Sequence, residues 1–160
     1  MTTERILLTR NGVKTLRAEL RQLKDEERPK VIEAIAEARS HGDLSENAEY
    51  DAAKEQQRFV EGRIRELEAS LSRAEVIDPA EIGKDGAVVF GATLLLYDEQ
   101  NDAEVTYQLV GNLEADLEQG RISISSPIGR ALLGKREGDE VEVAAPAGKR
   151  IYEILKVRYD

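Results

Sequence analysis

The sequence predicts an α+β protein, with an N-terminal antiparallel coiled-coil hairpin followed by a small antiparallel sheet covered by a short helix. Apolar residues recur every three or four positions through most of the first 75 residues, and one short polar stretch at 41–50 interrupts them. After Pro79, which cannot continue a helix, this period stops and short strand-like runs separated by turns replace it. We therefore expect two domains, at residues 1–77 and 78–160.

Both arms of the expected hairpin carry an apolar seam. Thr9 or Asn11 can cap the first helix, and Pro29 predicts a kink or a brief break within the first arm. The seam of the first arm consists of Val13, Leu16, Leu20, Leu23, Val31, Ile35 and Ala38. The seam of the returning arm consists of Ala52, Gln56, Val60, Ile64, Leu67, Leu71 and Ala74.

The polar stretch at 41–50 forms the tip of this hairpin. Gly42 favours a left-handed helix end, because it has no Cβ to oppose a positive φ. Asp43, Ser45 and Asn47 can each accept the N–H groups that open the next helix. Asp43 and Glu46 are also spaced as in a capping box, so one interpretation of this acidic pair is purely structural.

The second domain is predicted from alternation and turn signals. A strand-like stretch at 87–97, hinged at Gly91, precedes a hairpin partner at 105–110 and a short strand at 122–125. Ser126 and Pro127 then read as an N-cap and a first helical residue, and Gly134 closes a helix of about two turns. The last strands, at 140–143 and 151–157, are joined around 146–148.

Composition excludes several classes of function. Net charge is −9, from 23 basic and 32 acidic residues, so the chain lacks the basic surface with which a protein grips a phosphate backbone by itself. There is no cysteine, which excludes disulfides and thiolate metal sites and favours a reducing compartment. The apolar run at 6–8 is too short for a signal peptide or a membrane helix, so we expect a cytoplasmic protein that does not bind membranes.

The chemistry that remains is the carboxylate pair Asp43 and Glu46. His41 is the single histidine and is best interpreted as a helix C-terminal residue. Mg²⁺ typically takes one or two protein carboxylates, so this pair could help to hold the ion only if another molecule supplied further ligands. Arms of roughly 33 residues would place the pair at the end of a rod about 50 Å long, which suits donation to a partner.

Two stretches resemble the Gre family of bacterial transcript-cleavage factors. They are residues 36–57, which include His41-Gly42-Asp43-Leu44-Ser45-Glu46-Asn47, and residues 122–135, which include Ser126-Pro127-Ile128-Gly129-Arg130. The resemblance implies a C-terminal domain with the fold of FK506-binding proteins. It also implies a protein that is not itself an enzyme. Such a factor binds bacterial RNA polymerase at the secondary channel and stimulates cleavage of the backtracked nascent RNA 3′ end.

The resemblance also implies roles for individual residues. Asp43 and Glu46 match the tip acids that hold Mg²⁺ jointly with the polymerase, while the free factor binds no metal and is expected to be a monomer. Arg39 and Lys54 match a basic spot that contacts RNA, against the alternative of ordinary helix-surface residues. The segment Ser126, Pro127 and Ile128 is expected to contact the polymerase, against the alternative of a simple N-cap with a buried Ile128.

Two other functions stay open at this point. One is a channel-binding inhibitor or structural adaptor, for which Asp43 and Glu46 would be dispensable. The other is a prolyl isomerase or chaperone, which the scarcity of aromatic residues beyond Pro79 disfavours: Phe90 and four tyrosines, with no tryptophan.

Overall fold

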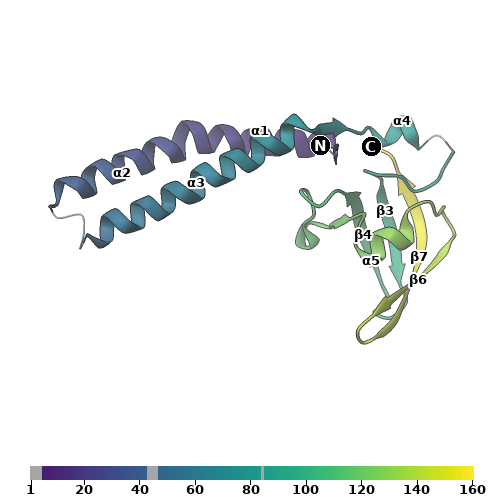
Figure 1. The fold of residues 1–160 in the computed structure, drawn as a ribbon. Helices are drawn as coiled ribbons and strands as arrows, with labels where there is room; N and C mark the ends of the chain where they lie inside the picture. Colours follow the sequence, from purple (N-terminus) through teal and green to yellow (C-terminus); the bar gives the residue numbers. More distant parts are fainter. Residues whose placement is uncertain (1–4, 43–46, 84) are drawn as a thin grey trace. The chain divides into compact units, whose positions relative to one another are not determined.

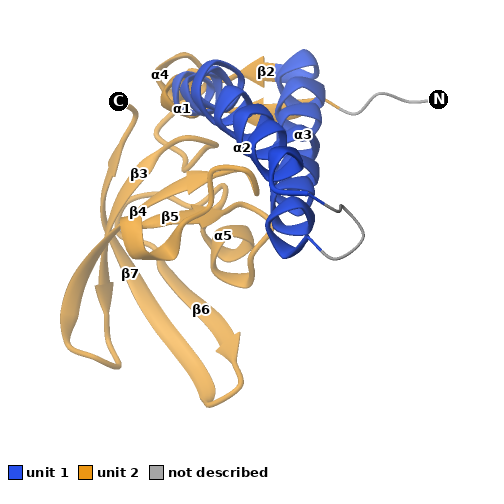
Figure 2. Cartoon of the chain, turned by 90° about the vertical axis from the view of Figure 1, so that its left-hand side faces the viewer, with its two compact units in different colours: residues 1–4, 13–74 blue, residues 5–12, 75–160 orange. Residues whose placement is uncertain are grey.

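A computed structural model describes residues 5–42, 47–83 and 85–160 of the chain. These residues form two compact units (Figure 2). The hairpin unit comprises Val13–Ala74, and the sheet unit comprises Arg5–Gly12 together with Glu75–Asp160. The tip acids Asp43 and Glu46 lie outside the described residues.

The hairpin unit is built from helix α1 (Arg10–Gln22), whose first three residues are grouped with the sheet unit, and from helices α2 (Arg28–Ser40) and α3 (Ala48–Ser72) (Figure 1). Thr9 Oγ1 accepts a hydrogen bond from the N–H of Gly12 at 3.0 Å, which confirms Thr9 as a cap of the first helix. The break expected near Pro29 is a π-helical segment, Leu23–Glu27, in which the N–H of Arg28 bonds the carbonyl of Leu23. The backbone thus passes Pro29 without ending the rod.

The seam of the hairpin is buried mostly as predicted. In the first arm Val13, Leu16, Leu23, Val31 and Ala38 are buried, whereas Leu20 and Ile35 are half-buried. In the returning arm the buried apolar side chains are Ala53, Val60, Ile64 and Leu67.

The assignment of Ala52 and Gln56 to the seam was wrong, because both residues are exposed. Extending the alternating steps of three and four residues backward from Val60 leads to position 57 and then to Ala53, not to positions 56 and 52. The inward face near the tip is therefore one residue later than the sequence suggested.

Ion pairs between the arms fix their register. Arg28 donates two hydrogen bonds to Glu61, at 2.7 and 2.8 Å. Arg63 binds Glu19 in the same two-point way, at 2.7 and 2.9 Å. The hydrogen bond from Arg28 lowers the pKa of Glu61 from its ordinary value, although burial opposes it. Paired planar groups of this kind define one alignment of the arms rather than several.

The larger sheet of the sheet unit has five strands in the order β5-β4-β3-β7-β6, all of which are labelled in Figure 2. The strands are β3 (Thr93–Asp98), β4 (Ala103–Val110), β5 (Arg121–Ser123), β6 (Glu140–Ala145) and β7 (Gly148–Arg158). Helices α4 (Pro79–Ile82) and α5 (Pro127–Leu132) belong to the same unit. The core contains the fully buried Leu94, Leu96, Leu109, Leu132 and Ile154.

Two expectations about the sheet need correction. The strand near 122–125 pairs with β4 in parallel, so the sheet is not antiparallel throughout. Residues 111–120, which include the 3-10 turn Leu117–Gln119, carry the chain back before β5 begins. Residues 87–91 are not a strand, because Gly91 has a φ of 85° and turns the chain there.

The division of the chain differs from the predicted one in two places, because residues 5–12 and residues 75–77 both belong to the sheet unit. Strand β1 (Ile6–Leu8) pairs with β2 (Ala74–Val76), and the N–H of Ile77 bonds the carbonyl of Leu8 at 2.9 Å. Glu114 accepts a further hydrogen bond from the N–H of Thr9 at 2.8 Å. These contacts join residues far apart in the sequence.

Among the residues that the structure describes, no helix has the length and apolar character to cross a membrane.

Candidate functional site

The described residues on both sides of the tip show how the two helices end and begin. The last helical residue of α2 is Ser40, and the N–H of His41 bonds the carbonyl of Ala38 at 3.2 Å. Gly42 has a φ of 115°, which confirms the positive φ predicted for it. His41 is therefore the C-cap residue of α2, as its position suggested.

Asn47 caps helix α3. Its side-chain oxygen accepts a hydrogen bond from the N–H of Tyr50 at 3.1 Å. The capping-box interpretation of Asp43 and Glu46 therefore does not apply to the start of α3, where Asn47 and Tyr50 hold the two positions concerned. Asn47 was one of three capping candidates in the sequence, and α3 starts four residues later than a cap at Asp43 would require.

Two contacts join the end of α2 to the start of α3. The side-chain amide of Asn47 donates to the carbonyl of Ala38 at 2.6 Å, in a partly buried position. His41 Nδ1 lies 2.9 Å from a carboxylate oxygen of Glu49. Sequence reasoning missed both contacts, since nine and eight residues separate the partners and no local pattern relates them.

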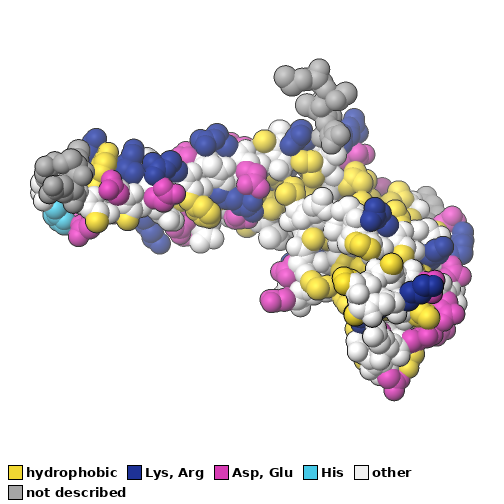
Figure 3. Space-filling model, turned by 60° about the horizontal axis from the view of Figure 1, so that its bottom comes forward, with side chains coloured by type: hydrophobic (Ala, Val, Ile, Leu, Met, Phe, Trp, Pro, Cys, Tyr) yellow, Lys and Arg dark blue, Asp and Glu magenta, His cyan; other side chains and the backbone are white. Residues whose placement is uncertain are grey.

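The two basic residues predicted to contact RNA lie on different arms. Arg39 is exposed in the last turn of α2. Lys54 is half-buried on α3, and its ammonium group donates to the side chain of Gln57 at 3.0 Å. Basic and acidic side chains are interspersed over the face of the hairpin that Figure 3 presents.

The segment predicted to contact a polymerase lies at the start of α5. Ser126 Oγ accepts from the N–H of Gly129 at 3.1 Å and donates to the carbonyl of Ser123 at 2.6 Å, so the predicted N-cap is confirmed. Pro127 is exposed, while Ile128 is partly buried against the sheet core. Pro127 and the exposed parts of Ser126 and Ile128 can be reached by a partner without unfolding the turn.

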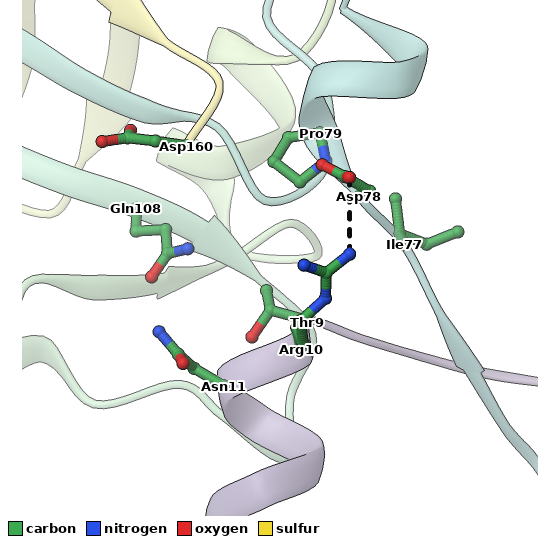
Figure 4. Close-up of a pocket in the computed structure, with 8 residues that line it drawn as sticks. All are labelled: Thr9, Arg10, Asn11, Ile77, Asp78, Pro79, Gln108 and Asp160. Atoms are coloured by element: carbon green, nitrogen blue, oxygen red, sulfur yellow. Dashed lines mark ion pairs between the residues drawn. The ribbon is translucent and has the colours of Figure 1, made fainter.

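A pocket of about 220 Å³ lies within the sheet unit, beside the first turn of α1 (Figure 4). Arg10 and Asp78 form an ion pair at 3.5 Å on its wall, and Gln108 and Asp160 lie among its other lining residues. The hydroxyl of Thr9 is already engaged, since it donates to Glu114 at 2.5 Å. The residues that line it include no histidine or cysteine, and Asp78 is paired with Arg10, so the pocket lacks the nucleophile and base expected of a hydrolytic active site.

The candidate donors for a metal ion are the two acidic residues of the tip sequence, Asp43 and Glu46. Within 5–42, 47–83 and 85–160, no three acidic or histidine side chains converge as a metal site would require. Asp43 and Glu46 are the oxygen donors that Mg²⁺ prefers, and two such donors suit a site completed by another molecule. The residues present thus fit a shared ion.

Comparison with known protein families shows to which class of proteins this chain belongs. Residues 6–76 match the family model of the N-terminal region of transcription elongation factors of the GreA/GreB type, and residues 83–159 match the model of the C-terminal region. The two matches cover nearly all of the hairpin and sheet units, so the class is that of transcription elongation factors.

Individual relatives narrow the assignment. The chain is 61% identical over 155 residues to transcription elongation factor GreA of Alkalilimnicola ehrlichii, covering 97% of this chain and 98% of the relative. It is 60% identical to GreA of Neisseria meningitidis serogroup A, covering 98% and 99%. The solved structure of the elongation factor GreA/GreB from Nitrosomonas europaea is 28% identical, with a TM-score of 0.42 and coverage of 97% and 100%. The chain belongs to the GreA/GreB family of transcription elongation factors, and its resemblance is to the GreA type.

Proposed function

We propose that this elongation factor binds bacterial RNA polymerase and stimulates the polymerase's own cleavage of backtracked RNA 3′ ends. The protein contributes no active site of its own. It delivers two carboxylates, Asp43 and Glu46, from the tip of the hairpin into the secondary channel.

One observation carries this proposal: the N-cap residue of helix α3 is Asn47, whose side chain accepts a hydrogen bond from the N–H of Tyr50. A capping role would have accounted for Asp43 and Glu46 without any function. Because Asn47 holds the N-cap position, a capping box built on Asp43 does not explain the acidic pair at the start of α3, and the proposed metal ion accounts for its charge.

Asp43 and Glu46 would hold a Mg²⁺ ion together with ligands of the polymerase. Such an ion stabilises the oxygens that gain charge when a phosphodiester is displaced in line. The role of this protein is to supply negatively charged oxygen donors, which leave the polymerase when the factor dissociates. Arg39 and Lys54 would neutralise phosphates of the displaced RNA end beside them.

Charge-neutral variants test the proposal. Polymerase halted in a backtracked complex with labelled RNA is mixed with the factor and Mg²⁺, and shortening of the RNA from its 3′ end is followed. Asp43→Asn and Glu46→Gln should each lower the cleavage rate by about two to three orders of magnitude, the usual cost of removing one electrostatic stabiliser from an active site. Raising Mg²⁺ should restore part of the rate by mass action.

Asp51→Asn is the matched control, because it removes the charge of an exposed acid in the first turn of α3. It should leave cleavage close to that of the parent. If the parent protein occupies the polymerase without shortening RNA, the factor is an inhibitor instead. If Asp43→Asn keeps the parental rate at limiting Mg²⁺, the metal-ligand role of Asp43 is refuted.

Docking would belong chiefly to the sheet unit, at Ser126, Pro127 and Ile128. The exposed ring of Pro127 and the partly exposed Ile128 offer an apolar contact that the cap at Ser126 holds in place. An isomerase function has less support, because Phe90 and Tyr152 are only 6% and 5% exposed and pack in the interior. These two rings are therefore not available to line a pocket for a proline peptide, which leaves only the half-buried Tyr97, Tyr107 and Tyr159 in this unit.

A further inference from the structure

We propose that Asn47 is a positioning residue for the tip acids. Through one side chain it caps α3 and ties α3 to α2, so it fixes the two points between which residues 43–46 run. This inference rests on the proposed function for its consequence in cleavage, but the tie itself can be measured without polymerase.

The two hydrogen bonds of Asn47 use opposite ends of its amide. The oxygen accepts from the N–H of Tyr50 at 3.1 Å, and the nitrogen donates to the carbonyl of Ala38 at 2.6 Å. A flipped amide would set oxygen against the carbonyl of Ala38 and lose both bonds, so the orientation is determined by its partners.

The carbonyl of Ala38 is a suitable anchor. It belongs to the last turn of α2, where carbonyl groups have no partner further along the helix. It accepts from the N–H of His41 at 3.2 Å and from Asn47 at 2.6 Å, which fills both of its lone pairs. The residue is only 2% exposed, so water competes poorly for this bond.

The second contact across the tip is weaker. His41 and Glu49 lie 2.9 Å apart, but their side chains are 51% and 70% exposed. Exposed pairs of this kind contribute little, because solvent screens them and two side chains must be ordered. Of these two contacts between described residues, the hydrogen bond of Asn47 is therefore the stronger connection between the helix ends.

Substitution of Asn47 by other good capping residues separates its role as the cap of α3 from its role as the tie to α2. Serine and aspartate cap helices about as well as asparagine does. Aspartate has no N–H to donate to Ala38, and the serine hydroxyl sits on a shorter side chain. Asn47→Ser and Asn47→Asp should therefore keep α3 intact while they break the tie to α2.

The first measurement uses the free protein. The chain has no cysteine, so nitroxide labels can be attached to Glu37→Cys on α2 and Ala48→Cys on α3, both of which are exposed. Dipolar electron paramagnetic resonance should give a broader distribution of label separations for both Asn47 variants than for the parent, with unchanged helicity by circular dichroism. Ser40→Ala is the control, since it removes a 2.6 Å bond to the carbonyl of Glu37 within α2 alone. It should leave the distribution unchanged.

The second measurement asks whether the tie matters for cleavage. Displacing a catalytic group by about 1 Å can cost up to about 100-fold in rate. Both Asn47 variants should therefore cleave about 10- to 100-fold more slowly than the parent and need more Mg²⁺ for half-maximal rate, while competing equally well for polymerase. A merely structural defect would weaken helicity or binding and would not raise the Mg²⁺ requirement.

The two measurements separate the possible failures. Parental label separations in both Asn47 variants would overturn the tie, whatever the cleavage rate. Broadened separations with parental cleavage, in an assay where Asp43→Asn is inactive, would overturn the positioning role. If Asp43→Asn is itself fully active, the proposed function fails, and the label separations alone decide whether Asn47 joins the helices.

Discussion

Replacing Leu67 with alanine should destabilise the hairpin far more than the same change at Leu20. Leu67 is 1% exposed in the seam of α3, whereas Leu20 is half-buried on α1. Removing a fully buried leucine loses its transfer free energy and leaves a cavity, so we expect Leu67→Ala to cost about 3–4 kcal/mol. Part of Leu20 already contacts water, so its loss should cost only about 1–2 kcal/mol.

Urea denaturation followed by far-ultraviolet circular dichroism measures the difference, because α1, α2 and α3 supply nearly all of the helical signal. Phe59→Ala is the surface control: Phe59 is 66% exposed, so the change should stay within about 0.5 kcal/mol. Equal losses for Leu67→Ala and Leu20→Ala would refute the seam described here. A loss of unfolding free energy in Phe59→Ala as large as that in Leu67→Ala would refute it as well.

Two further predictions concern the sheet unit. Burial of the Asp98 carboxyl raises its pKa, but the hydrogen bonds from Asn101 and the charge of Arg150 outweigh burial and hold the pKa below its ordinary value of about 3.9. The ionised carboxyl therefore stabilises the fold above pH about 4, and this contribution is lost as pH falls through the folded-state pKa. Asp98→Asn should lower the free energy of unfolding at neutral pH. In urea denaturation repeated at several pH values, the variant should also lose less stability between neutral and acidic pH than the parent does. Pro127→Glu should weaken competition for polymerase by about tenfold or more if this turn docks, whereas Pro146→Glu, at an exposed proline of the β6–β7 turn, should not.

The hairpin could be predicted because its contacts follow from local periodicity. Steps of three and four residues identify a buried stripe wherever the side chains are large, as at Val60, Ile64 and Leu67. Near the tip the candidates are alanines and glutamines, which carry little hydrophobic signal, and there the sequence favoured Ala52 although Ala53 is buried. The phase of a helix is thus predictable only as far as its apolar side chains are distinctive.

The sheet unit was harder because its pairings are distant. Alternation correctly placed β4 beside β3, since a short polar turn joins them. Nothing in Arg121–Ser123 indicates that it runs parallel to β4, because a strand's own residues do not record the direction of its neighbour. Likewise Ile6–Leu8 forms a strand only because β2, about 70 residues later, pairs with it.

The tip, where we propose that the function resides, shows the same limit of prediction from sequence. Asp43, Ser45 and Asn47 are all competent caps, and intrinsic preference hardly separates them. Asn47 differs in having an N–H beside its oxygen, and the carbonyl of Ala38 on the other helix is there to receive it. The partner that selects the cap is brought into place only when the hairpin closes. Because Asn47 holds the N-cap position, a capping box built on Asp43 does not explain the acidic pair at the start of α3, and the shared metal ion that we propose accounts for its charge instead.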